Sequence, residues 1–303
     1  MYRLRLHGRG GHGIKTAGRV MGTAFFLAGF EVQDAPRYGA ERRGAPIFAY
    51  VRADRRPIRE RGIIRRPDLV AVADDTLLTM PAAGVLDGVT SRTVLLVRTA
   101  ESPGLWQERL AFPGLLLTLP AGEDDSGELR FIAAPLIGAA ARLVGVIPRE
   151  ALAQALREEL APLGEETVRE NLSRALQGFD LLSDHAGCVT EGPEPTPEGY
   201  AKPHWVELAP EEAEVAAPAI YTPATSEAVP TGLWRTFRPV LDERRCRRCA
   251  WICSTLCPDG TISIGEEGLP VFDYRHCKGC LVCVASCPAH ALRAVPEREA
   301  AKG

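Results

Sequence analysis

Two kinds of hydrophobic periodicity alternate along the first 180 residues. Residues 2–6 alternate with a period of two and predict a strand, and residues 14–30 carry apolar positions on one face of an expected helix. Residues 47–52 predict a second strand. Continuous apolar runs at residues 67–73, 93–97 and 115–119 predict strands that are buried on both faces, as in a covered parallel sheet.

Helical patterns lie between and after these strands, at residues 136–144, 149–160 and 165–176. Strands that alternate with helices indicate an α/β domain of the doubly wound type. From about Asp184 the composition shifts to Pro, Glu, Ala and Thr, which buries too little apolar surface to fold alone and predicts an extended linker. We therefore expect an α/β domain in residues 1–183, a linker in residues 184–233, and a separate domain in residues 234–303.

Eight of the nine cysteines fall in two runs near the C-terminus, and each run ends in Cys-Pro. The second run, residues 277–288, has the bacterial C-x₂-C-x₂-C-x₃-C-P spacing, in which three close thiolates hold one iron–sulfur cluster and the fourth reaches the other cluster. The first run, residues 246–258, is its near twin, with one extra residue between Cys249 and Cys253.

This crossed rule predicts a ferredoxin-like domain of the bacterial kind with two [4Fe-4S] clusters. The expected ligands of the first cluster are Cys246, Cys249, Cys253 and Cys287, and those of the second are Cys277, Cys280, Cys283 and Cys257.

Two other uses of the cysteines fit the spacing less well. Cysteines two or three residues apart, in a chain without a secretory signal, suit metal binding better than disulfide bridging. Two zinc sites would use C-x₂-C pairs, but zinc needs neither a third close cysteine nor a trailing Cys-Pro. Cys188 stands alone and is expected to be a free structural thiol.

The charge pattern points to a binding surface near the N-terminus. The net charge of the 303 residues is −3, yet residues 1–66 hold fifteen Lys and Arg against five Asp and Glu. Excess arginine beside a glycine-rich turn favours a phosphorylated or carboxylate ligand, or else a basic face that docks on an acidic partner subunit. No recognised binding motif accompanies the charge, so nucleic acid is not an expected partner.

The apolar segments of the chain bear on where in the cell the protein is expected. The first residues contain no apolar signal region, and the longest apolar run, around residues 20–30, is interrupted by glycine and too short to span a bilayer. No membrane contact is therefore expected. Thiolate clusters favour the same reducing compartment, so we expect a cytoplasmic protein suited to anaerobic metabolism.

A glycine-rich turn follows the first predicted strand. Gly8, Gly10 and Gly13 match G-x-G-x-x-G between a strand and a helix, a context in which backbone N–H groups hold phosphate. No acidic residue marks the end of a second strand for ribose binding. The pattern therefore does not favour a dinucleotide-dependent dehydrogenase.

Residues 7–13, HGRGGHG, followed by residues 38–46, YGAERRGAP, resemble the gamma subunit of 2-oxoacid:ferredoxin oxidoreductases, the pyruvate synthase family. His12 stands where that family usually has glutamine. Residues 232–240 together with the double cysteine run are similar to the delta subunit of the same family. The order of the two resemblances implies a fused gamma and delta subunit.

The resemblance implies a role as an electron-transfer subunit. In that family, thiamine diphosphate and Mg²⁺ lie on alpha and beta subunits, where a 2-oxoacid is oxidatively decarboxylated, and delta-type clusters pass the electrons to ferredoxin. Most members transfer the acyl group to coenzyme A. The sequence shows no convincing nucleophile, base or thiamine motif, so we expect catalysis on the partner subunits and no catalytic residue here.

The basic turn is the candidate site for the phosphate end of coenzyme A, with these expected contacts: Gly8, Arg9, Gly10, Gly11, Gly13, Arg42 and Arg43. The alternative is that the arginines pair with acidic residues or with a partner subunit. Two other functions stay open. One is a subunit of a relative that needs no coenzyme A, such as an oxalate or aryl 2-oxoacid oxidoreductase, and the other is a free-standing ferredoxin-like carrier.

Overall fold

The computed structural model describes residues 1–37, 44–121, 133–193 and 230–300. The chain forms two compact units, residues Met1–Pro193 and Glu194–Gly303, which we call the N-terminal and C-terminal units. Each unit is described by itself below. Among the described residues, no helix combines the length and the apolar character that a bilayer crossing requires.

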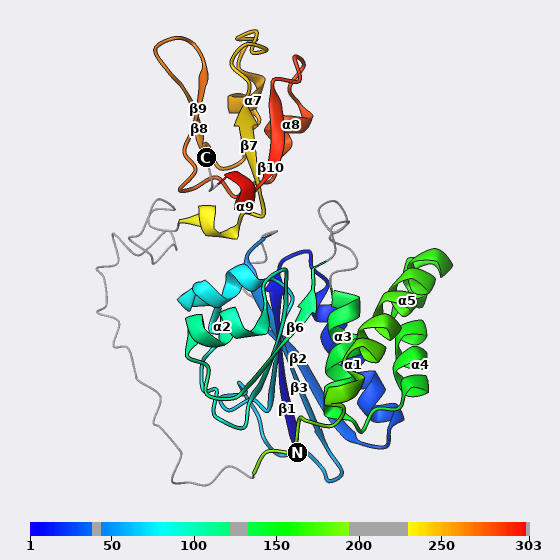
Figure 1. The fold of residues 1–303 in the computed structure, drawn as a ribbon. Helices are drawn as coiled ribbons and strands as arrows, with labels where there is room; N and C mark the ends of the chain where they lie inside the picture. The colour runs from blue at the N-terminus through cyan, green and yellow to red at the C-terminus, as the bar shows by residue number, and fades with distance from the viewer. Residues whose placement is uncertain (38–43, 122–132, 194–229, 301–303) are drawn as a thin grey trace, which may run out of the picture. The chain divides into compact units, whose positions relative to one another are not determined.

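The N-terminal unit is built on a six-stranded mixed sheet with the order β2-β3-β1-β4-β5-β6 (Figure 1). Its strands are β1 (Tyr2–Arg9), β2 (Glu31–Arg37), β3 (Pro46–Asp54), β4 (Leu69–Val72), β5 (Val94–Thr99) and β6 (Leu115–Pro120). Neighbours among β1, β4, β5 and β6 run parallel, whereas β3 pairs antiparallel with both β1 and β2. The expected α/β class and the buried parallel strands are confirmed. The antiparallel pairing of β2 and β3 at the edge of the sheet was not expected. It follows from chain length, since the eight residues between β2 and β3 are too few for a parallel crossover.

Helices cover both faces of this sheet (Figure 1). They are α1 (Ile14–Leu27), α2 (Pro103–Leu110), α3 (Ala133–Val144), α4 (Arg149–Leu160) and α5 (Glu165–Leu181), with short 3₁₀ helices at Asp75–Thr79, Pro81–Ala83, Ala161–Leu163 and Ser183–His185. Helix α1 ends three residues before the expected position because Gly29 takes a left-handed φ of 84°. One apolar core joins α1, α3, α4 and α5 to the sheet, and a second packs Trp106 of α2 against the opposite face.

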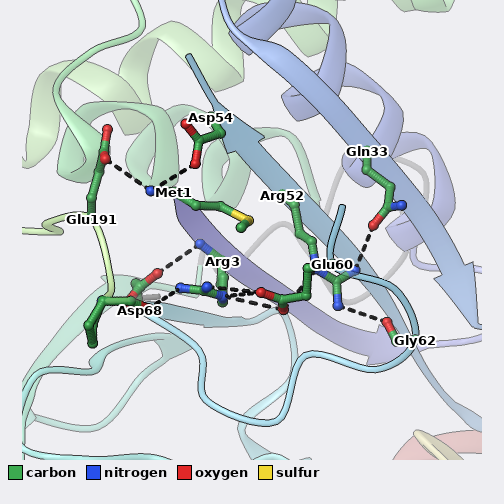
Figure 2. A network of polar contacts seen from close by, with 10 residues as sticks. Met1, Arg3, Gln33, Arg52, Asp54, Glu60, Gly62, Asp68 and Glu191 are labelled. Atoms are coloured by element: carbon green, nitrogen blue, oxygen red, sulfur yellow. Dashed lines mark hydrogen bonds and ion pairs between the residues drawn. The ribbon is translucent and has the colours of Figure 1, made fainter. Parts of the chain in front are cut away.

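The polar positions of β1 are buried, although an alternating strand normally turns them to water. Arg3, Arg5, His7 and Arg9 are all at most 5% exposed. Figure 2 shows how part of this row is neutralised: the Glu60 carboxylate accepts from Arg3 Nη2 at 2.8 Å and from Arg52 Nε at 3.1 Å. Some of the excess arginines in residues 1–66 are therefore buried in ion pairs within the N-terminal unit.

The segment after α5 returns to the N-terminal unit. Val189 is 1% exposed and its N–H donates to Leu143 O at 2.9 Å, while the Gly192 N–H donates to Met1 O. The compact unit thus reaches Pro193, whereas the expected boundary was residue 183. Residues 194–229 of the expected linker lie outside the described residues, so the three-part division of the chain stays a prediction.

The C-terminal unit contains two small antiparallel ladders. The first pairs β7 (Phe237–Leu241) with β10 (Leu292–Pro296), and the second pairs β8 (Ile262–Ile264) with β9 (Pro270–Phe272). A 3₁₀ turn at Thr231–Trp234 precedes them, and the short helices are α7 (Ile252–Thr255), α8 (Val282–Ala285) and α9 (Glu297–Ala300). Each cysteine run therefore folds as a loop, one turn of helix and a short strand.

Candidate functional site

Two hollows in the C-terminal unit are each lined by four cysteine side chains. The first hollow is lined by Cys246, Cys249, Cys253 and Cys287, and the second by Cys257, Cys277, Cys280 and Cys283. Each set takes three residues from one run and the fourth from the other, which is the grouping that the crossed spacing predicts. All eight cysteines are free of disulfide bonds, so each hollow offers four thiol ligands. That donor set fits a [4Fe-4S] cluster, which is held by four cysteine thiolates.

The two cysteine loops share a backbone path despite the extra residue in the first. Trp251 and Leu281 each stand directly before a short helix and have left-handed φ values of 44° and 61°. They are equivalent positions, so the loop between Cys249 and Trp251 absorbs the insertion at Ala250. The Trp251 indole N–H donates to Gly268 O at 3.0 Å and anchors this altered loop to the turn between β8 and β9.

Groups four residues after each terminal cysteine contact its sulfur. The Ala291 N–H donates to Cys287 Sγ at 3.3 Å, and the Thr261 hydroxyl lies 3.4 Å from Cys257 Sγ. Hydrogen bonds to ligand sulfur are one of the factors that set the potential of an iron–sulfur cluster. The difference between an amide and a hydroxyl at equivalent positions gives the two hollows different electrostatic surroundings.

Four negatively charged thiolates close together in a partly buried hollow require a nearby positive charge to stay deprotonated. Burial, with the neighbouring Cys277 and Cys280 adding to the effect, raises the pKa of Cys283 to about 12. Burial also raises the pKa values of Cys277 and Cys253, and Cys287 adds to the effect on Cys253. Bound metal would supply the positive charge that holds these sulfurs deprotonated.

Arg235, two residues before β7, contacts the backbone of the second cysteine loop, a role that sequence reasoning missed. Its Nη1 donates to Cys277 O at 2.7 Å and to Tyr274 O at 2.6 Å, and its Nε donates to Glu297 at 2.7 Å. These partners lie 39 to 62 residues away along the chain. No local pattern could have revealed the contact.

The glycine-rich turn lies where it was expected, between β1 and α1. A Cβ atom at Gly8 would lie 2.5 Å from Ile14 Cγ1, so this glycine lets the helix pack closely on the strand. Gly11 and Gly13 have positive φ values of 97° and 74°. The Gly10 N–H donates to Ala45 O at 2.8 Å, so that group is already used within the protein.

Arg9 is engaged inside the N-terminal unit. Its side chain is 2% exposed, and its guanidinium donates to Asp74 Oδ2 at 2.8 Å, to Thr76 Oγ1 at 2.7 Å and to Gly44 O at 3.0 Å. Burial raises the pKa of Asp74, but Arg9 and Thr76 outweigh it and hold the pKa below its ordinary value. Arg42 and Arg43, the other two expected arginines, lie outside the described residues.

Comparisons with known proteins match both units. A family model described as "Pyruvate ferredoxin/flavodoxin oxidoreductase" matches residues 3–181, and one described as "4Fe-4S dicluster domain" matches residues 238–288. Pyruvate synthase subunit PorC of Thermotoga maritima is 33% identical over 178 residues, which cover 58% of this chain and 91% of that protein.

Of two further relatives, one matches the larger share of this chain and the other matches the smaller share. The pyruvate/ketoisovalerate oxidoreductases common subunit gamma of Pyrococcus furiosus is 34% identical over 173 residues, covering 56% of this chain and 92% of that protein. Pyruvate synthase subunit PorD of Methanocaldococcus jannaschii is 45% identical over 83 residues, covering 27% of this chain and 95% of that protein. The relatives that match the larger and the smaller share of this chain are thus separate subunits.

Proposed function

The chain belongs to the pyruvate ferredoxin/flavodoxin oxidoreductase family, and from this premise we propose that it is the electron-transfer and support subunit of a thiamine diphosphate-dependent 2-oxoacid:ferredoxin oxidoreductase. Gamma-type and delta-type parts would be joined in one polypeptide. The observation that carries the proposal is the pair of hollows, each lined by four free cysteines from both runs.

The C-terminal unit would hold two [4Fe-4S] clusters, which take up and release single electrons when bound. Cys246, Cys249, Cys253 and Cys287 would bind the first, and Cys277, Cys280, Cys283 and Cys257 the second. The chain's own contribution is to hold these sulfurs in place, to limit the access of water, and to set the local charge through Arg235 and the groups that contact sulfur.

The reaction itself would take place on partner subunits. We place thiamine diphosphate and Mg²⁺ on the alpha and beta subunits, where a 2-oxoacid loses carbon dioxide and two electrons. Two one-electron carriers in this chain suit that release, because they can take the electrons in turn and pass them to ferredoxin. No residue of this chain is assigned a catalytic role.

The N-terminal unit would contribute to binding coenzyme A. The support for this is the exposed Gly11 at the start of α1, a helix whose first turn has no side-chain cap, so N–H groups are available to a phosphate. Arg42 and Arg43 would supply the charge. Arg9 would act indirectly, since its bonds to Asp74 and Gly44 tie the turn to the neighbouring loop.

The burial of Arg9 also supports a second candidate, a relative that uses no coenzyme A and keeps the basic turn as a docking surface. The test is anaerobic dye reduction by the natively purified complex against a panel of 2-oxoacids, each with and without coenzyme A. Activity that depends on coenzyme A is the expected result. Activity without it would favour the second candidate, and no activity with any acid would contradict the proposed function.

A further inference from the structure

Charged side chains border the two hollows unequally. The first hollow is lined by Arg247 and Arg248, both exposed, and by no acidic residue. The second is lined by Lys278 and Asp259, which neutralise each other in an ion pair of 3.0 Å. Arg244 and Arg245 extend the positive surface of the first hollow because they are exposed and directly precede Cys246.

We call these four residues, Arg244, Arg245, Arg247 and Arg248, the arginine collar. Among the residues that the structure describes, the collar guanidiniums form no ion pair with a carboxylate. Asp242 and Glu243 directly precede the collar in the chain and are exposed, as Arg244 and Arg245 are. Four arginines against two carboxylates give the segment before and within the first cysteine loop a net positive charge.

Arg248 has a left-handed backbone conformation although its side chain carries a Cβ. Arg248 and Gly279 are equivalent positions of the two cysteine loops, and both have left-handed φ values, 49° and 68°. Glycine adopts this conformation without strain, whereas a residue with a Cβ does not. At Gly279 a Cβ would lie 2.3 Å from Phe237 O, so only glycine fits there, whereas the first loop has an arginine at the equivalent position.

The first hollow is also the more exposed of the two. All four of its cysteines are partly exposed, whereas Cys277 and Cys283 of the second hollow are only 9% and 7% exposed. Electron transfer to an external protein slows steeply with distance. An outgoing electron would therefore leave more readily from the first hollow.

We propose that the arginine collar is the docking surface for an acidic electron-carrier protein, and that electrons leave the chain through the cluster held by Cys246, Cys249, Cys253 and Cys287. The inference rests on the proposed function and deepens it by assigning the exit cluster and its docking residues. Positive charge around the exit would steer an acidic carrier toward the cluster and orient it there. The ion pair of Lys278 and Asp259 gives the second hollow no such excess of positive charge.

The test uses the whole complex with the double substitution Arg247→Glu and Arg248→Glu. Turnover is measured with a purified acidic ferredoxin and, separately, with a viologen dye, over a range of ionic strength. We expect the apparent KM for ferredoxin to rise about tenfold at low salt and to converge on the wild-type value at high salt, where charge is screened. The matched control is Arg275→Glu, at the position equivalent to Arg244 in the second run, which should leave the KM within about twofold.

A second variant separates docking from folding. Arg248→Gly removes the charge together with the backbone strain, so the complex should be at least as heat-stable as the wild type while its apparent KM for ferredoxin rises. A loss of stability with an unchanged KM would overturn the inference. Failure of the charge-reversed chain to join its partner subunits would also overturn it, because the collar would then be a subunit interface.

These results are distinguishable from a failure of the proposed function. Dye reduction driven by a 2-oxoacid tests the function alone, whereas the ratio of ferredoxin to dye turnover tests the collar. A complex that reduces dye normally, yet shows the same ferredoxin KM and the same salt dependence with and without the collar, would refute the docking surface and leave the function intact.

Discussion

Arg235 and Glu297 form an ion pair that ties the beginning of β7 to α9, with the Arg235 Nε atom 2.7 Å from Glu297 Oε2. Arg238 joins the same carboxylate. Burial raises the pKa of Glu297, but the bonds from both arginines outweigh it and lower the pKa to about 2. The pair is connected to the second set of cysteines, because Arg235 also donates to Cys277 O.

We predict that Arg235→Met weakens the hold on the second cluster, so that this variant loses cluster faster than the control variant does. The substitution removes the bonds to Cys277 O and Tyr274 O and leaves Glu297 with only the partly exposed Arg238, at a cost of about 3 kcal/mol in the C-terminal unit. The measurement is the loss of visible absorbance during anaerobic iron chelation. Arg293→Met, at an exposed position of β10, is the control. Equal release rates in the two variants would count against a role for Arg235.

The crossed grouping of cysteines predicts which cluster each terminal cysteine supports. Cys257→Ala should damage the second cluster, although Cys257 lies in the first run, and Cys287→Ala should damage the first. Low-temperature EPR of the reduced variants, with iron and sulfide analysis, measures this. Cys188→Ala is the control and should leave two intact spectra. Two intact [4Fe-4S] spectra in both test variants would refute the ligand assignment.

Helix packing in the N-terminal unit depends on Gly138 of α3. A Cβ at this position would lie 1.7 Å from Ala175 O of α5, a backbone atom that cannot turn aside. Gly138→Ala should therefore lower the free energy of unfolding by about 3 kcal/mol. Gly104→Ala in α2 has no atom within 4 Å of the new Cβ and should raise it by about 0.5–1 kcal/mol. Denaturant unfolding of the two variants would show this contrast, and an equal effect would contradict it.

A buried histidine should make the N-terminal unit sensitive to acid. Burial and, to a smaller extent, the charge of Arg5 lower the pKa of His7 to about 3, although a backbone hydrogen bond at Ala83 opposes the shift. Between pH 6.5 and about pH 3, the His7 imidazole is therefore protonated in the unfolded chain but neutral in the folded chain. The stability that this group contributes is complete above pH 6.5 and is lost as the pH falls toward 3.

The expected loss is about 2 kcal/mol between pH 6.5 and about pH 5. His7→Phe should flatten this part of the pH profile, whatever its effect on the absolute stability. Thermal unfolding at a series of pH values provides the measurement. His12, whose pKa burial lowers to about 4, should add to the slope, so His12→Gln is the companion variant. An unchanged slope in both variants would contradict the assignment.

Local patterns predicted most of the N-terminal fold. The continuous apolar runs of β4, β5 and β6 and the helical patterns of α3, α4 and α5 are found close to their expected residues. Strand β2 was missed because its sequence, EVQDAPR, mixes polar residues with Pro36 and lacks the pattern of a buried strand. It lies at the sheet edge, where a proline does not interrupt the pairing on both sides.

Part of the candidate site could likewise be predicted from local patterns, and part could not. Cysteine spacing is local information, so both hollows could be anticipated from the sequence. The partners of Arg9 and Arg235 lie 35 to 67 residues away along the chain, and no spacing rule indicates them. A count of basic residues could not separate arginines buried against Glu60 and Asp74 from arginines available to a ligand.

In the proposed function, electrons from a 2-oxoacid pass through clusters held by this chain. The direct measurement is EPR of the anaerobic complex, freeze-quenched after mixing with the 2-oxoacid that supports dye reduction, with coenzyme A added where that activity requires it. The comparison is a complex that carries both Cys257→Ala and Cys287→Ala. In the wild type we predict signals of reduced [4Fe-4S] clusters from this chain. In the double variant we predict that both these signals and the reduction of ferredoxin are lost. Ferredoxin reduction at the wild-type rate by the double variant would contradict the claim.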